Sequence, residues 1–237
     1  MKSIGILVAM KDELAPLRKR YSLEWTGPGN FFTGKNRGMR LQFALSGAGP
    51  HRAAETMRKL VRYGKPDVLL GLGLSGGLSP DVSLADVVLG SSVQAPGQPT
   101  LQASLSLLPA DFSSESGPLL TLPTVLGTRA EKAEVAAVYP DCWAIDMETY
   151  SLARAAHAAG LPWLSLRVIS DPWNRDLPVD FNRYLDEQGQ ASILPLLTDA
   201  ARNPNLLGAL MRFGKDVFRA REPLLQRFDE LLEALSS

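Results

Sequence analysis

The chain has 237 residues, and its 25 lysines and arginines balance its 25 aspartates and glutamates. This length suits one large α/β domain, and a net charge of zero removes the electrostatic field that recruits nucleic acid. A single cysteine, Cys142, excludes an internal disulfide and a cysteine-based zinc cluster, and two histidines are too few for a histidine-rich metal centre. No segment reaches the roughly 20 apolar residues of a membrane span. We therefore expect a cytoplasmic chain that needs no metal and no cofactor.

In the first third of the chain, apolar runs alternate with amphipathic segments. Residues 4–8 predict a buried strand, and residues 10–20 predict a helix. Residues 31–33 and 40–45 predict a hairpin, and a second helix is expected from about residue 51 to 62. This order is typical of an α/β unit.

The middle of the chain combines two apolar strands with glycine-rich segments. Residues 67–72 and 86–89 predict the strands, and residues 46–49 and 71–77 predict glycine-rich turns that let a ligand approach the backbone. Residues 94–117 are rich in proline, serine and glycine. We expect this stretch to connect elements, with at most one short helix.

Regular structure resumes after the connection. Residues 119–125, 143–145 and 163–169 predict strands, residues 128–131 match a capping box that opens a helix, and residues 149–159 predict a further helix. Alternating strands and helices predict a three-layer α/β fold, with a mixed, mostly parallel central sheet flanked by helices.

The C-terminal part has a different pattern. We assign residues 1–181 to the α/β domain and residues 182–237 to a helical extension packed on it, with breaks at Gly189, Pro195 and Pro204. Six basic residues between positions 202 and 227 flank an apolar stripe at helical spacing. Such a stripe suits an anionic membrane surface, and it equally suits packing on the same domain or on a second subunit. We expect a homodimer or a higher homo-oligomer.

The segment 71–77 matches two well-known motifs, G-x-G-x-x-G and G-x-S-x-G, the second with Ser75 as nucleophile. Both mechanisms require a helix directly after the turn, whereas here the chain passes through Pro80 towards another strand. A serine hydrolase also needs a histidine base, and only His157 follows, among alanines on a predicted helix. A serine hydrolase remains an alternative, and we favour a glycine-rich turn beside a ligand.

Acidic residues follow three of the predicted strands. Glu13 comes after the first strand, Asp146 and Glu148 after the strand at 143–145, and Asp171 after the strand at 163–169. Each acid alone is also explained as a helix cap, Asp146 in particular. Ligands of open α/β sheets bind beyond the carboxyl ends of strands. The set of acids therefore predicts a site for a polar ligand with hydroxyl groups and a basic ring.

These segments resemble the methylthioadenosine/S-adenosylhomocysteine nucleosidases of the nucleoside phosphorylase/nucleosidase superfamily, over roughly residues 1–175. The resemblance rests on five motifs in the same order, at residues 4–13, 46–49, 73–78, 146–148 and 167–171. Within the superfamily the chain is most similar to the hopanoid-associated phosphorylase group, through residues 46–53, 170–172 and 177–178 and the long helical tail. That group is associated with the release of adenine from adenosylhopane.

The resemblance implies roles for individual residues. Asp171 would protonate or hydrogen-bond N7 of the purine, and Glu13 would orient and deprotonate the attacking water. Glu148 would bind the ribose hydroxyls, with Met147 against the sugar. The remaining substrate-binding positions that it implies are Gly47, Gly73, Leu74, Val125 and Leu126.

Whether water or phosphate attacks stays open at this point. Glu13 favours water because a carboxylate repels phosphate, whereas Arg52 beside the 46–49 turn suits phosphate as a co-substrate. Leu74 replaces a serine common in the nucleosidases, and the connection at 91–119 is shorter than theirs, which speaks against methylthioadenosine itself as substrate. A non-catalytic nucleoside-binding protein is the alternative from another class.

Overall fold

The computed structural model describes residues 2–26, 30–112, 114–186, 190 and 193–236. Its strands are β1 (Ser3–Val8), β2 (Glu24–Trp25), β3 (Phe31–Asn36), β4 (Met39–Leu45), β5 (Val68–Gly77), β6 (Val87–Gln94), β7 (Leu101–Gln102), β8 (Ser116–Thr121), β9 (Ala144–Asp146) and β10 (Trp163–Asp171). Its helices are α1 (Lys11–Arg20), α2 (Pro50–Lys59), α3 (Arg129–Val138), α4 (Thr149–Ala159), α5 (Ile193–Arg202) and α6 (Pro204–Ser236). Short helical turns are η1 (Leu60–Gly64), η2 (Leu105–Leu107) and η3 (Phe181–Tyr184).

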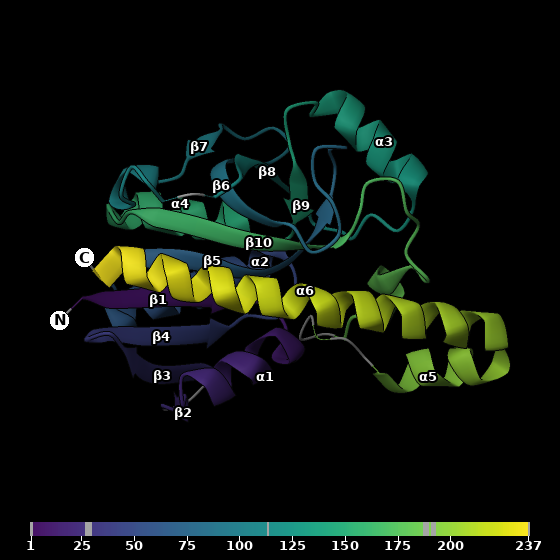
Figure 1. The fold of residues 1–237 in the computed structure, drawn as a ribbon, viewed down its shortest axis with the longest axis horizontal. Helices are drawn as coiled ribbons and strands as arrows, with labels where there is room; N and C mark the ends of the chain where they lie inside the picture. Colours follow the sequence, from purple (N-terminus) through teal and green to yellow (C-terminus); the bar gives the residue numbers. More distant parts are fainter. Residues whose placement is uncertain (1, 27–29, 113, 187–189, 191–192, 237) are drawn as a thin grey trace.

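The strands form one mixed sheet in the order β10-β6-β8-β9-β5-β1-β4-β3-β2, with β7 beside β6 (Figure 1). Because β10 also pairs with β5, the strands β5, β10, β6, β8 and β9 close into a ring. Parallel pairings join β1 to β4 and β5, β5 to β10, and β8 to β6 and β9, and the other pairings are antiparallel. The predicted fold of a mixed sheet flanked by helices is confirmed.

Local patterns placed several elements where the structure has them. The hairpin of β3 and β4 turns through Arg37 and Gly38, both at positive φ. At the start of α3, Thr128 Oγ1 accepts a hydrogen bond from Glu131 N at 3.2 Å, and Glu131 Oε2 accepts one from Thr128 N at 2.8 Å. The predicted capping box is therefore confirmed.

The prediction of a glycine-rich turn at residues 71–77 is wrong, because β5 runs through the whole segment. Its glycines do not change the direction of the chain. They leave space for neighbouring side chains. A Cβ atom at Gly73 would lie 2.7 Å from Glu13 Oε1, and one at Gly71 would lie 3.1 Å from Ser165 Oγ. The strand therefore brings its backbone close to the polar groups around it.

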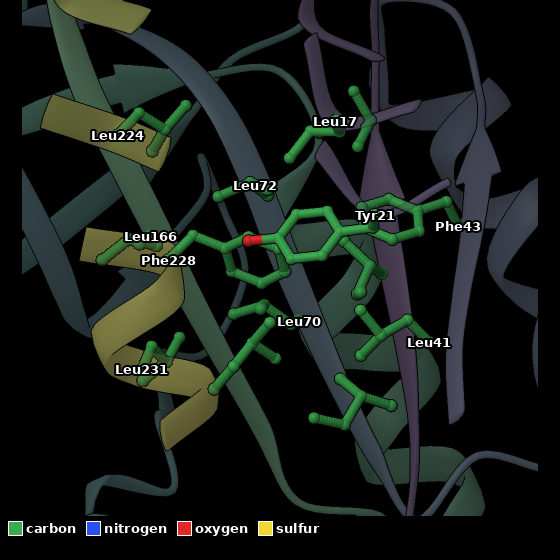
Figure 2. Packing of buried hydrophobic residues seen from close by; sticks show 14 of the residues in the cluster. Leu17, Tyr21, Leu41, Phe43, Leu70, Leu72, Leu166, Leu224, Phe228 and Leu231 are labelled. Carbon is green, nitrogen blue, oxygen red and sulfur yellow. The ribbon is translucent and has the colours of Figure 1, made fainter. Parts of the chain in front are cut away.

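The two faces of the sheet are covered by different helices. The helices α2 and α4 pack on one face, and α1 and the C-terminal half of α6 pack on the other. Figure 2 shows this second layer, where Tyr21, Phe43 and Phe228 meet with ring centroids 5.4 to 6.2 Å apart. Burial of one such aromatic side chain contributes about 2 to 3 kcal/mol. The C-terminal half of α6 is thus part of the core.

The predicted helical tail is present as η3, α5 and α6. Pro204 is the first residue of α6, where its missing N–H leaves no hydrogen bond unmade, while Pro195 lies within the first turn of α5. The predicted break at Gly189 lies outside the described residues. The division of the chain at residue 181 stays a prediction.

The first half of α6 and the whole of α5 extend beyond the edge of the sheet as a helical hairpin (Figure 1). Where the structure is described, no helix has both the length and the apolar character needed to cross a bilayer.

Candidate active site

A cavity of about 360 Å³ opens at the carboxyl ends of β1 and β10, beside residues 73–76 of β5. Glu13, Glu148 and Asp171 all line it. Three acids that are up to 158 positions apart in the chain (171 − 13) therefore share one cavity, as their positions after strands predicted.

Asp171 is the last residue of β10, and only 7% of it is exposed. Its Oδ2 atom accepts a hydrogen bond from Lys132 Nζ at 2.5 Å, and its Oδ1 atom accepts one from Ser170 Oγ at 2.7 Å. Burial raises the pKa of Asp171, while the ammonium of Lys132 and the hydroxyl of Ser170 act in the opposite direction. Without a solvent shell, this carboxyl is held between a charged and a neutral donor.

Glu148 precedes α4 and is also buried. Its Oε1 atom accepts a hydrogen bond from Gly49 N at 3.0 Å, and its Oε2 atom lies 3.8 Å from Nη1 of Arg167. Burial raises the pKa of Glu148 to about 7, and neighbouring Asp146 adds to the rise while Arg167 opposes it. One oxygen of this carboxylate is thus fixed by backbone, and the other is near a cation.

Asp146 has the structural role that its cap-like position suggested. Its carboxylate accepts hydrogen bonds from Thr121 Oγ1 at 2.7 Å and from the backbone N–H of Thr149 at 3.2 Å, and it pairs with Arg167 Nε at 3.0 Å. Arg167 is itself 2% exposed and reaches Thr149 Oγ1 through Nη2 at 3.0 Å. Asp146 therefore holds the arginine that in turn faces Glu148.

Glu13 lies in the first turn of α1, and its carboxylate accepts hydrogen bonds from two backbone N–H groups. Met10 N donates to Oε2 at 2.9 Å, and Leu74 N of β5 donates to Oε1 at 2.8 Å. Burial raises the pKa of Glu13, and these two hydrogen bonds oppose the rise. The side chain is thereby fixed between α1 and β5 at the cavity wall.

Most of the other predicted binding residues also line the cavity, namely Gly73, Leu74, Val125, Leu126 and Met147. Gly47 does not, and its neighbour Ala48 lines the cavity instead. The N–H of Gly47 donates to Ala9 O at 2.9 Å, and its φ of 82° shapes the turn after β4. Gly47 thus joins that turn to the end of β1 by a backbone hydrogen bond. Arg52 is not among the lining residues.

The serine hydrolase alternative fails on geometry. The strand β5 continues past Ser75 to Gly77, so no helix begins after the serine to form a nucleophile elbow. His157, the one histidine that follows Ser75, is exposed on α4. The side chain of Ser75 is buried at the cavity wall, and its Oγ makes no hydrogen bond within the described part of the structure.

Among the contributions to the cavity that sequence reasoning missed, two bear directly on its chemistry. Lys132 of α3 lines it and contacts Asp171, although its position on the same helix face as Val135 and Tyr139 marked it as an inward-facing lysine. The second contribution comes from α6, whose cavity-lining residues are Phe213, Val217, Arg221, Leu224 and Leu225. Helical spacing predicted an apolar stripe on this helix but not the surface that the stripe covers.

Comparison with protein families places this architecture. A family model described as the phosphorylase superfamily matches residues 3–194, which is most of the chain. The chain belongs to the phosphorylase superfamily. Membership confirms the superfamily that the five sequence motifs indicated, and with it the expectation of an enzyme. Within the described ranges no cluster of three or more His, Cys, Asp or Glu residues is arranged to hold a metal ion.

Two relatives of the chain are nucleosidases by name. The 5′-methylthioadenosine/S-adenosylhomocysteine nucleosidase of Anoxybacillus flavithermus is 26% identical over 213 residues, covering 78% of this chain and 92% of the relative. The enzyme of the same name from a Marinomonas strain is 25% identical over 222 residues, covering 82% of this chain and 96% of the relative.

Solved structures share the fold across almost the whole chain. The 5′-methylthioadenosine/S-adenosylhomocysteine nucleosidase of Neisseria meningitidis, in complex with methylthio-immucillin-A, superposes with a TM-score of 0.74 at 20% identity and covers 99% of this chain and 100% of its own. The S-adenosylhomocysteine nucleosidase of Streptococcus pyogenes gives the same TM-score at 19% identity, covering 99% of this chain and 97% of its own. At these identities the likeness shows the fold alone.

Proposed function

We propose that the protein hydrolyses the N-glycosidic bond of an adenine nucleoside that carries a bulky apolar 5′ group, and releases adenine. The observation that carries this proposal is the shared cavity of Glu13, Glu148 and Asp171. Breaking a purine N-glycosidic bond builds positive charge on the ribose and negative charge on the departing base. The reaction therefore needs an acid at the base and carboxylates around the sugar.

Each of the three acids has a role in this proposal. The Asp171 carboxyl donates its proton to N7 of the purine, which makes the base a better leaving group. Glu148 accepts hydrogen bonds from the ribose hydroxyls, and Met147 packs against the sugar. Glu13 orients the water that attacks C1′ and takes its proton. Gly73, Leu74, Val125 and Leu126 form the wall around the base.

The surroundings of Glu13 favour water over phosphate as nucleophile. Both of its oxygens are held by backbone N–H groups, from Met10 and Leu74, that an incoming anion would otherwise use. Arg52, the candidate phosphate ligand, lies outside the cavity lining. A phosphate dianion beside Glu13 would be repelled by its carboxylate, so inorganic phosphate enters only in the alternative, a phosphorolytic reaction.

The part of the cavity formed by α6 supports a large apolar 5′ group. Phe213, Val217, Leu224 and Leu225 contribute apolar side chains to the lining, together with the charged Arg221. This wall fits an adenosylhopane-type substrate of hopanoid biosynthesis, the substrate class suggested by the subgroup resemblance. The alternative substrates are 5′-methylthioadenosine and S-adenosylhomocysteine, which the names of the curated relatives contain.

The same proposal includes a cellular setting. We expect a cytoplasmic homodimer or higher homo-oligomer whose C-terminal helices touch the inner membrane face. Met211 and Phe218 of α6 are 59% and 71% exposed, and Lys215 and Arg219 lie beside them. An apolar surface with basic neighbours suits anionic lipid.

The decisive experiment is an adenine-release assay over a panel of adenine nucleosides with 5′ groups of increasing apolar size, each run with and without phosphate. We expect release without phosphate that becomes faster with larger 5′ groups. Replacement of Asp171 by Asn should slow release by about 10²- to 10⁴-fold, because a positioned general acid contributes that much. Replacement of Asp141, an exposed acid before β9, by Asn serves as the control and should leave the rate unchanged.

Three results would contradict the proposal. Undiminished turnover in Asp171→Asn removes the acid role, and release that depends on phosphate identifies a phosphorylase. Saturable binding of the nucleosides with no release under any condition identifies the alternative, a non-catalytic nucleoside-binding protein.

A further inference from the structure

Among the lysines that the structure describes, Lys132 alone is buried, with 1% of its surface exposed. Its Nζ atom donates to Asp171 Oδ2 at 2.5 Å and to the backbone oxygens of Pro172 at 3.0 Å and Arg175 at 3.4 Å. Three N–H groups thus meet three oxygen acceptors, which is the hydrogen-bonding pattern of an ammonium group.

The start of α3 places Lys132 close to the end of β10. Lys132 lies in the first turn of α3, and the capping box of Thr128 and Glu131 fixes where that helix begins. Its neighbours on the same face are the partly buried apolar residues Val135 and Tyr139. A buried ammonium loses its hydration, and only strong pairing offsets that loss. An apolar side chain would fill this position without the loss of hydration. We therefore expect the charge of Lys132 to act on its partner, Asp171.

We propose that Lys132 is a positioning residue for Asp171, whose carboxyl it orients and whose anionic form it stabilises after proton transfer to the leaving base. This inference rests on the proposed function. The two oxygens of Asp171 are held from different sides, Oδ2 by Lys132 and Oδ1 by Ser170. The carboxyl plane is thereby fixed, and each oxygen keeps a second lone-pair direction for a proton or a ligand.

The chemical step leaves the lysine unchanged. The O–H of Asp171 gives its proton to N7 while the C1′–N9 bond breaks, and the electron pair of that bond goes to the base. Water bonds to C1′, and its proton goes to Glu13. Asp171 is left as a buried carboxylate, and Lys132 keeps its three protons and now donates to an anion, which is the stronger hydrogen bond.

Other charged groups act on Asp171 from further away or share its cavity. They come from the loop after β10, from α1, from the end of β9, from the start of α4 and from α6, and are Arg175, Asp12, Glu13, Asp146, Glu148 and Arg221. The guanidinium of Arg175 is bound to Asp216 at 2.6 Å, and the adjacent strand β5 presents Gly76, which has no charge. Burial raises the pKa of Asp171, and Lys132 is the largest opposing influence. Removal of Lys132 therefore raises this pKa further.

The test compares Lys132→Met, which removes the charge, with Lys132→Arg, which keeps it. The measurement is kcat/KM for adenine release as a function of pH. Activity of the unaltered protein should fall at high pH as Asp171 loses its proton. In Lys132→Met this fall should move to higher pH by about one pH unit or more, and kcat should decrease about tenfold or more because the product carboxylate lacks its counter-charge. Lys132→Arg should keep the original profile.

Lys59→Met is the matched control, because Lys59 pairs with Glu55 at 2.7 Å on an exposed helix face. It should change neither the profile nor kcat. A folded Lys132→Met protein with an unmoved high-pH fall would overturn the inference. If Lys132→Met fails to fold, Lys132→Gln replaces it, since glutamine keeps N–H donors without the charge.

Failure of the proposed function is distinguishable from failure of this inference. If no nucleoside releases adenine, the carboxyl carbon of Asp171 is titrated by ¹³C NMR in the unaltered protein and in the Lys132 variant, with Asp171→Asn for assignment. A titration at higher pH in the variant supports the electrostatic role of Lys132 without any turnover. Identical titrations overturn it.

Discussion

Acidic side chains outnumber basic side chains in the lining of the cavity. Because Asp146, Glu148 and Asp171 are buried, the excess of carboxylates affects both catalysis and stability. Arg167 is shared by Asp146 and Glu148, while Lys132 serves Asp171. Positive charge that develops on a ribose is stabilised by such an excess of carboxylates. The same excess opposes folding whenever all the acids are ionised, because each buried carboxylate has lost its hydration.

The pKa of Glu148 makes the cost of burying an ionised carboxylate measurable. Its pKa is about 7 in the folded protein against an ordinary value of 4.5. The folded state thus binds the proton more tightly, and stability contributed by the protonated form is lost as pH rises from about 4.5 to above 7. Replacement of Glu148 by Gln removes this titration. The variant should therefore gain about 3 kcal/mol relative to the unaltered protein between pH 4 and pH 8.

Urea unfolding of both proteins at several pH values measures this gain. Glu55→Gln, on an exposed surface, is the control and should show no such gain. Parallel pH dependences for Glu148→Gln and the unaltered protein would show that Glu148 titrates in its ordinary range. In either case adenine release by Glu148→Gln should be strongly reduced, since the ribose hydroxyls lose a carboxylate acceptor.

At the scale of whole elements, the start of each helix decides where a functional side chain points. The capping box fixes the first turn of α3, and Lys132 follows Glu131 directly. In α4, Glu148 occupies the position before the first helical residue, so its carboxylate stands at the cavity rather than along the helix. The cap of α3 was predictable from the sequence because its hydrogen bonds join residues three positions apart.

Thr128→Ala tests whether the cap of α3 supports the site as well as the helix. Loss of the hydrogen bond from Glu131 N should lower the free energy of unfolding by about 1 kcal/mol. A shift of the first helical turn also moves Lys132, so kcat should fall more than in a control of similar stability. Glu55→Ala, which breaks a surface pair on α2, provides that control in denaturation and adenine-release measurements. Equal activities in the two variants would contradict the coupling.

For the whole molecule, α6 joins two surfaces that function differently. Its C-terminal half packs on the sheet through Phe228, while Phe213 and Val217 face the cavity. Met211 and Phe218, in the first half of α6, are exposed. The proposed lipid-facing surface and part of the cavity wall therefore come from the same half of one helix.

Vesicle co-sedimentation tests that surface. The protein should bind vesicles that contain anionic phospholipid, and added salt should weaken binding because Lys215 and Arg219 contribute charge attraction. Replacement of Met211 and Phe218 by Ser should weaken binding about tenfold or more, since each side chain buries apolar area in the lipid. Val138→Ser, which alters another strongly exposed apolar residue, is the control. Equal binding by all three proteins would exclude this surface as the contact.

The amino-acid sequence by itself determined the alternation of strands and helices, the caps and the three acids after strands. These features depend on hydrogen bonds and periodicities within a few residues, so they are visible in any short window of the chain. Segment 71–77 was misread for the same reason, because glycines indicate a turn locally, whereas here they admit Glu13 beside β5.

Only the tertiary structure decided which groups meet. The pairing of Lys132 with Asp171 joins positions 39 residues apart, and the lining supplied by Phe213 and Val217 comes from a helix that crosses the sheet. The sequence predicted Gly47 in the cavity wall, whereas the next residue of the turn, Ala48, lines it. Contacts between distant elements depend on how their faces pack, and burial then sets the protonation of the acids they enclose.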